Sequence, residues 1–250
     1  MGSFPQSIVH YLPVTDHDER WGIVCTTAGY QNVPPGSPYP LTQHPDSYSF
    51  TRSRGRVLGE YQLLYIVSGQ GEFRSASSPA APVKAGTVVM LFPDEWHTYA
   101  PAPETGWEEW WVGFRGENID RRVAEGFFSP KTPLLHIGHS AGIVSCYQEI
   151  IRSAEEERKG FQQLVTGIVL HLLGSVLFKR DNLQYLDNPI VEKINRAREM
   201  MRRHIGDNLP PEEIARRLNI GYTWFRRTFR AYVGIAPAQY QLQLRHNKAR

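Results

Sequence analysis

The sequence is poor in cysteine, in long apolar runs and in export signals. Its 250 residues contain two cysteines, Cys25 and Cys146, with no paired spacing, which favours reduced thiols over a disulfide framework. The longest apolar stretches, 86–93 and 170–178, are well short of the ~20 residues of a membrane helix. Residues 1–20 lack the basic start and apolar core of a secretory signal. We therefore expect a cytoplasmic protein with no membrane span.

Residue patterns typical of catalysis and metal binding are also scarce. No two histidines have the His-x-His spacing of a metal site, and the spacing of His136 and His139 is unremarkable. No Ser–His–Asp arrangement and no phosphate-binding loop stand out. We expect no catalytic residue, no metal and no cofactor, and hence a protein that is not an enzyme.

Charge is divided unevenly along the chain. Residues 188–250 contain 13 of the 28 Lys and Arg residues and 5 of the 25 Asp and Glu residues. Residues 1–187 contain the other 15 basic and 20 acidic residues. The balance is therefore +8 in the C-terminal part and −5 in the rest. A basic segment on a mildly acidic body is typical of a protein that binds a polyanion with one part only. Nucleic acid is the first candidate partner, and a solvated basic face is the alternative.

Residues 20–115 have the pattern of strands and turns. The β-branched and aromatic segment 60–68 leads into Gly69-Gln70-Gly71 and then into 72–75, which predicts a hairpin that turns at the glycines. Residues 86–93 are a short apolar run closed by proline, and 107–114 form another strand. Short strands separated by Gly, Pro and Ser turns favour an all-β barrel or sandwich over βαβ units.

Two helices are predicted after residue 140, over 142–159 and 161–180, and residues 181–189 then have the composition of a polar linker. The second helix has a wide apolar face. Such a helix often packs both on its own barrel and on a second copy of itself, so we expect a homodimer, with packing inside one chain as the alternative. The residues we assign to dimerisation are Leu164, Ile168, Leu172 and Val176.

The basic region predicts a helix-turn-helix. After a helix that starts at Pro189, residues 211–219 form a short helix, 220–223 a tight turn and 224–233 a second helix. An arginine on such a helix can bind guanine or phosphate in the major groove, the alternative being a solvated face. The inward residues of the second helix are Phe225, Phe229 and Tyr232. The residues expected to contact DNA are Thr223, Arg226, Arg227, Arg230 and the adjacent Tyr222.

Together these segments resemble the AraC family of transcriptional regulators. The residues similar to the family's first helix-turn-helix are Ile214, Ala215, Leu218, Phe225, Phe229 and 234–240, followed by 242–249 as the start of its linking helix. The segments that resemble the family's cupin-type effector domain are 61–71, 85–87, 92–99 and 107–114. The resemblance covers nearly the whole chain.

The resemblance implies an α+β fold, with a cupin-like β-barrel, a helical dimerisation segment and an all-α helix-turn-helix domain. The implied parts are an arm and barrel over 1–140, with the arm in 1–20, a helical pair over 141–180, a linker over 181–189 and the DNA-binding unit over 190–250. The implied partners are double-stranded promoter DNA, a small-molecule effector and RNA polymerase. Because the sequence stops inside the linking helix, we expect a partial chain that lacks the second helix-turn-helix and binds DNA more weakly.

Three positions depart from the family's pattern. Gly221 stands where a serine-like N-cap is common, and Asn219 stands where many such turns carry glycine. Ala236 replaces the usual Ser or Thr before Pro237.

The strand over 107–114 suggests a sugar site. Its alternation places Trp107, Glu109 and Trp111 on one face, and a carboxylate between two indoles suits a sugar ring and its hydroxyls. The alternative is that the tryptophans are core and Glu109 is solvated. The family resemblance implies an effector site formed by Arg54, Tyr99, Glu109 and Trp111, with Thr26 and Thr27 on a facing strand and His97 nearby.

Two other functions stay open at this point. One is an AraC-type regulator with no small-molecule effector, whose pocket is packed core. The other is a cupin-fold enzyme, since many cupins hold a metal through two histidines and a carboxylate. His97 alone matches such a ligand, so we assign it to the pocket rather than to a metal.

Overall fold

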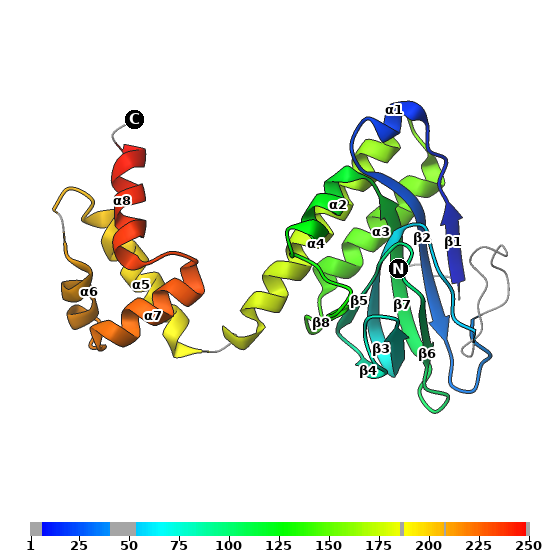
Figure 1. The fold of residues 1–250 in the computed structure, drawn as a ribbon, viewed down its shortest axis with the longest axis horizontal. Coiled ribbons are helices and arrows are strands. Elements are labelled where there is room, and N and C mark those ends of the chain that lie inside the picture. The colour runs from blue at the N-terminus through cyan, green and yellow to red at the C-terminus, as the bar shows by residue number, and fades with distance from the viewer. Residues whose placement is uncertain (1–6, 41–53, 186–187, 208, 249–250) are drawn as a thin grey trace. The chain divides into compact units, whose positions relative to one another are not determined.

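A computed structural model describes residues 7–40, 54–185, 188–207 and 209–248 (Figure 1). The chain divides into two units, Met1–Leu183 and Gln184–Arg250. The strands of the first unit are β1 (Ser7–Tyr11), β2 (Val24–Val33), β3 (Tyr61–Ser75), β4 (Ala81–Lys84), β5 (Thr87–Leu91), β6 (His97–Pro101), β7 (Trp107–Arg115) and β8 (Leu134–His136). Its helices are α1 (Asp16–Glu19), α2 (Glu117–Ala124), α3 (Ala141–Glu156) and α4 (Phe161–Asn182).

All strand pairs of the first unit are antiparallel. The sheet order is β1-β2-β7-β3-β5-β8, and β4 and β6 pair with β3. The predicted fold class, a β-structure followed by helices, is confirmed.

The hairpin predicted at residues 69–71 is wrong, because β3 runs without reversal along its whole length. Its first half pairs with β5 and β7, and its second half pairs with β4 and β6. Gly69 lies at φ +79°, and a Cβ there would stand 2.1 Å from the carbonyl oxygen of Gly106. Gly69 therefore permits a close approach of two backbones. The pattern Gly69-Gln70-Gly71 had instead predicted a turn.

Strand β7 is buried on both faces, which gives the unit two cores. Trp110, Val112 and Phe114 belong to the core between the sheet and the helices, and Trp107 and Trp111 belong to the core of the barrel interior. The predicted alternation over 107–114 is confirmed by this division.

Helices α3 and α4 pack on β2, over one face of the sheet (Figure 1). The fully buried apolar residues of α4 are Val165, Val169, Leu172, Leu173 and Val176. Burial of each such side chain contributes roughly 1.5–3 kcal/mol. Among the described helices, α4 alone is long and apolar enough to cross a membrane by length and composition. One side of α4 packs against β2 and α3, and its other side carries the exposed residues Leu164 and Phe178.

The helix ends differ from the predicted ones by a few residues. The helix expected over 142–159 ends at Glu156, because Glu157 adopts the left-handed conformation at φ +42°. Helix α4 continues to Asn182 and is followed by the 3-10 turn Leu183–Tyr185, so residues 181–185 of the predicted linker are helical. Residues 186 and 187 of that linker lie outside the described residues.

The second unit has its own core. Its helices are α5 (Pro189–Arg203), α6 (Pro211–Arg217), α7 (Tyr222–Val233) and α8 (Pro237–Lys248). Asn188 caps α5 through a hydrogen bond of 3.0 Å from the Ile190 amide, and Pro189 occupies the first helical position. The buried residues of the core are Ile194, Ala197, Met201, Leu209, Ile214, Ala215, Phe225 and Phe229.

Helix α7 begins two residues before the predicted start, inside the predicted turn. Asn219, between α6 and α7, lies at φ +53° and so replaces the glycine common in such turns, since asparagine tolerates this conformation. Gly221 caps α7 without a side-chain hydrogen bond. The departures noted at these two positions are therefore compatible with the turn.

Candidate functional site

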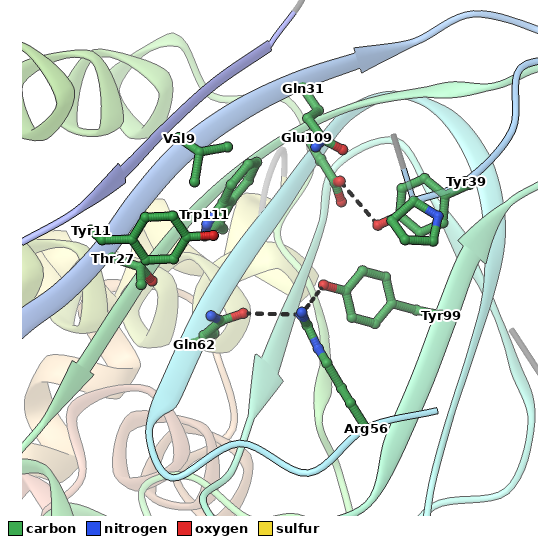
Figure 2. Close-up of a pocket in the computed structure, with 11 residues that line it drawn as sticks. Val9, Tyr11, Thr27, Gln31, Tyr39, Arg56, Gln62, Tyr99, Glu109 and Trp111 are labelled. Atoms are coloured by element: carbon green, nitrogen blue, oxygen red, sulfur yellow. Dashed lines mark hydrogen bonds between the residues drawn. The ribbon is translucent and has the colours of Figure 1, made fainter. Parts of the chain in front are cut away.

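A pocket opens in the barrel, with walls from β1, β2, β3, β6 and β7 (Figure 2). The cavity has a volume of about 30 Å³. This is room for a few water molecules, so a larger ligand has to move side chains. The lining residues are Val9, Tyr11, Thr27, Gln31, Tyr39, Pro40, Arg56, Gln62, Tyr99, Glu109 and Trp111.

Glu109 is a buried carboxylate in this pocket. It is 3% exposed, so the alternative in which it is solvated is wrong. Its Oε1 accepts a hydrogen bond of 3.0 Å from the Tyr39 hydroxyl, and its Oε2 has no partner among the described residues. Burial raises the pKa of Glu109 from 4.5 to about 7, opposed in part by the Tyr39 hydrogen bond, the charge of Arg56 and the nearby indole N–H of Trp107. The unpaired oxygen is an acceptor available to a ligand.

Arg56 lies across the pocket from Glu109 (Figure 2). Its Nη2 donates to the Tyr99 hydroxyl at 2.7 Å and to Gln62 Oε1 at 3.5 Å. Two backbone hydrogen bonds with His97, of 2.9 and 3.0 Å, fix its main chain against β6. The guanidinium is therefore held in one place by neighbours from two strands.

His97 holds the guanidinium from the side of β6. Its Nε2 accepts a hydrogen bond of 3.2 Å from Arg56 Nε, and its Nδ1 lies 3.0 Å from the Glu95 carbonyl oxygen. Because Arg56 Nε can only donate, the ring proton of His97 is on Nδ1. Burial and the charge of Arg56 lower the pKa of His97 from 6.5 to about 4, so the ring is neutral near pH 7. Both ring nitrogens are engaged, and the role of His97 here is to position Arg56.

A second carboxylate, Glu60, orders the polar side of the pocket. Its Oε1 accepts from Gln62 Nε2 at 2.8 Å and from Thr27 Oγ1 at 3.2 Å. A Cβ on Gly113 would stand 2.4 Å from the same oxygen, so a glycine is needed at that point of β7. Gln62, which also accepts from Arg56, thus links the carboxylate to the guanidinium.

Trp111 supplies an aromatic wall. Its register partner on β2 is Gly29, which pairs on its other side with Val9 of β1. Tyr11, the last residue of β1, also lines the pocket and is 40% exposed. Residues 7–20 of the predicted arm thus include a strand that forms part of the pocket wall, while residues 1–6 lie outside the described residues.

The structure brings together most of the residues predicted for the effector site. Thr27, Tyr99, Glu109 and Trp111 line the pocket, and His97 lies behind Arg56. The lining residues that the sequence analysis missed are Val9, Tyr11, Gln31, Tyr39, Pro40, Arg56 and Gln62. Period-2 alternation along residues 7–11 is a signal that could have indicated Val9 and Tyr11.

Arg54 and Thr26 do not line the pocket. Arg54 is exposed, and its carbonyl accepts from the indole of Trp96 at 2.9 Å, whereas Arg56, two residues on, is the one bridged to β6. Thr26 is the unpaired residue of a bulge in β2, between Cys25 and Thr27, and it is not among the residues that line the pocket. The structure does not bring Arg54 and Thr26 to this pocket, and their assignment to the effector site stays a prediction.

Residues 138–142 match the Gly-x-Ser-x-Gly pattern of hydrolase nucleophiles, a match that the sequence analysis overlooked. The serine of that motif normally lies on a strained turn with its hydroxyl exposed. Here Ser140 is extended, at φ −150°, and its hydroxyl accepts a hydrogen bond of 3.4 Å from the Ile143 amide. Ser140 is the N-cap of α3, and this geometry gives it no nucleophilic role.

Helix α7 presents a basic surface. Phe225 and Phe229 are buried in the core of the second unit, and the opposite side of the helix is exposed. The predicted contact residues that are exposed are Thr223, Arg226, Arg227 and Arg230, while Tyr222 is half-buried. The structure therefore places all four on one surface.

The residues predicted for dimerisation do not share one environment. Leu164 is 52% exposed and Ile168 is half-buried, but Leu172 and Val176 are fully buried in the core of their own chain. Successive residues spaced by four drift about 40° around a helix, so this row turns from solvent into the core. The assignment of Leu172 and Val176 to a dimer surface is wrong.

Residues 35–173 match the family described as the AraC-like ligand binding domain. The Msm operon regulatory protein of Streptococcus mutans is 21% identical over 196 residues, which cover 77% of this chain and 70% of that protein. The raffinose operon transcriptional regulatory protein RafR of Pediococcus pentosaceus is 21% identical over 214 residues, which cover 81% of this chain and 74% of that protein. The MmsAB operon regulatory protein of Pseudomonas aeruginosa is 24% identical over 189 residues, which cover 74% of this chain and 60% of that protein.

Solved structures also align with this chain. ToxT from Vibrio cholerae aligns over 95% of this chain and 97% of its own, with 12% identity and a TM-score of 0.29. An RmlC-like cupin protein from Methanocaldococcus jannaschii aligns over 48% of this chain and 93% of its own, with 14% identity and a TM-score of 0.30.

The pocket-bearing barrel and the matched family define a transcription regulator with a ligand-binding domain. The chain belongs to the AraC family.

Proposed function

We propose that this chain senses a carbohydrate in the barrel pocket and, in the cytoplasm, controls the transcription of genes for its use. The observation that supports an effector site is that the buried Oε2 of Glu109 has no hydrogen-bond partner among the described residues. A sugar hydroxyl can donate to this oxygen, and a neighbouring hydroxyl can accept from a donor such as Arg56. The indole of Trp111 offers a face for the C–H side of the ring. The similarity to a protein named for the raffinose operon supports this class of ligand.

We also propose that α7 binds promoter DNA. This helix has no acidic residue, and its exposed arginines lie on the face opposite the buried Phe225 and Phe229. A helix of this kind fits the major groove, where arginine binds bases and phosphates. RNA polymerase is a further partner of such a regulator, and we propose no enzymatic activity for the chain.

Homodimerisation is assigned to the outer side of α4. Leu164 and Phe178 are 52% and 69% exposed there, and Cβ atoms on Gly167 and Gly174 would meet nothing within 4 Å. A shallow groove lies between α3 and α4 at this surface, and Cys146 of α3 and Leu164 of α4 both line it. Exposed apolar side chains and bare glycines let a second helix approach closely, so this surface suits a second copy of the chain.

The effector proposal is tested by titration calorimetry of the chain with a panel of mono-, di- and trisaccharides. At about pH 8, where Glu109 is ionised, we expect saturable heat with at least one sugar, and a loss of affinity of about tenfold or more in Glu109→Gln, because a charge-assisted hydrogen bond is removed. Glu108→Gln is the matched control, since this neighbour faces the other side of β7. No heat from any sugar, or equal loss in both variants, would overturn the carbohydrate site.

A further inference from the structure

The outward surface of α7 has a definite order of side chains. At about 100° per residue, the exposed positions follow one another around the helix as Arg226, Arg230, Thr223, Arg227, Ala231 and Trp224. Thr223, Arg227 and Arg230 occupy the middle of this surface, and Arg226 and Trp224 occupy its two edges. In a helix laid in a groove, the middle faces the base edges and the edges face the backbone walls.

The chemistry of this surface is restricted. Helix α7 contains no Asn, Gln, Asp or Glu. Asparagine and glutamine are the side chains that bind adenine N6 and N7 together, and carboxylates are those that accept from cytosine N4. Arginine binds guanine O6 and N7, and a threonine methyl contacts the methyl of thymine. The surface therefore has the groups that recognise guanine and thymine and lacks those that recognise adenine and cytosine.

The arginines of α7 differ in their surroundings from most others in the same unit. Arg216 and Arg217 both pair with Glu213, at 2.7 and 2.9 Å, and Arg196 pairs with Glu192 at 2.7 Å. No carboxylate in the described part of the chain pairs with any arginine of α7. Their charge and their N–H groups are thus available to DNA without breaking an ion pair.

Resting on the DNA-binding function proposed above, we propose that α7 recognises guanines through Arg227 and Arg230 and thymine methyls through Thr223. It forms no bidentate contact with adenine. Arg226 contacts phosphate at one edge of the helix, and Trp224 packs on the sugar-phosphate wall at the other. Sequence discrimination by this helix is then concentrated in G·C pairs, whose hydrogen bonds are stronger than a methyl contact.

The test starts from duplexes that the full 250-residue chain selects from a random pool. Affinity is then measured after replacing bases by analogues, one position at a time. We expect 7-deazaguanine, which lacks the N7 acceptor, to lower affinity about tenfold at one or two positions. Uracil in place of thymine should lower it slightly, and 7-deazaadenine should have no effect at any position.

Variants separate the two kinds of arginine. Arg227→Ala should abolish the tenfold preference for guanine at one position. Arg226→Ala should weaken binding equally for every duplex and reduce the slope of log affinity against log salt by about one. Arg196→Ala is the matched control, because it removes the same charge from α5. Equal losses with 7-deazaadenine and 7-deazaguanine, or uniform weakening by Arg227→Ala, would overturn this readout. A chain that selects no duplex would instead overturn DNA binding itself.

Discussion

The indole of Trp111 occupies the space that a side chain on Gly29 would fill. A Cβ on Gly29 would stand 2.1 Å from Cζ2 of Trp111 and 2.6 Å from the carbonyl oxygen of Ile8. Because Gly29 has no side chain, the indole of Trp111 can lie against β2 and form the aromatic wall of the pocket. Strand β1 pairs with β2 at Gly29 and covers this position.

Gly29→Ala is expected to lower the free energy of unfolding by about 1–3 kcal/mol, because the added methyl displaces the indole or β1. It should also weaken effector binding. Chemical denaturation and titration calorimetry measure the two effects. Gly142→Ala in α3 is the control, since a Cβ there meets nothing within 4 Å, and it should be neutral or stabilising. Equal stability of both variants would contradict the steric argument.

His97→Phe keeps an aromatic ring of similar size but removes the acceptor for Arg56 Nε. The guanidinium N–H then lacks a partner, and we expect a loss of about 1–3 kcal/mol in unfolding free energy. Effector affinity should fall as well, because Arg56 is no longer held. The same substitution at the exposed His139 should change stability by less than about 0.5 kcal/mol. Unchanged effector affinity in His97→Phe would mean that Arg56 does not need this neighbour.

The stability of the first unit should depend on pH through Glu109. Its pKa rises from 4.5 to about 7 on burial, so the folded state holds this proton more tightly than the unfolded chain. The contribution is fully present below about pH 4.5 and is lost as pH rises through about 7, by roughly 3 kcal/mol at most. His97 acts in the opposite direction, since its lowered pKa costs stability as pH falls from 6.5 to about 4.

Comparison with Glu109→Gln isolates this contribution, because His97 is common to both proteins. The free energy of unfolding is measured by urea denaturation at about pH 5 and about pH 8. The variant should gain stability relative to the parent at the higher pH. An identical pH dependence of the two proteins would mean that Glu109 titrates alike in the folded and unfolded states.

Leu164→Arg is expected to prevent self-association and leave the fold intact, because Leu164 is half-exposed on the outer side of α4. Leu172→Ala should instead lower the free energy of unfolding by about 2–5 kcal/mol, since Leu172 is fully buried in its own chain. Sedimentation velocity and thermal denaturation distinguish the two outcomes. A dimer that survives Leu164→Arg would place the interface elsewhere.

Local periodicity was enough to predict part of the pocket and the surface of α7. The alternation of Trp107, Glu109 and Trp111 along β7 depends only on the geometry of a strand. The exposed row Thr223, Arg227 and Arg230 likewise follows from the helical repeat around the buried phenylalanines. Both features were therefore visible without the fold.

Arg56 could not be predicted in this way. Its position depends on a bridge to His97, 41 residues away in sequence, and two arginines separated by one residue look alike in the sequence. The wide apolar face of α4 posed the same difficulty. Hydrophobic spacing shows that Leu164 and Leu172 share a helix, but it cannot show which side the barrel covers.

Strand β3 has a consequence for how this chain tolerates changes of length. It pairs with four strands, β4, β5, β6 and β7. One residue inserted near its centre would turn the side chains of one half to the opposite face and shift the register of that half against its two partner strands. Insertions and deletions among relatives should therefore accumulate in connections such as 76–80 and 102–105, and β3 should keep its length.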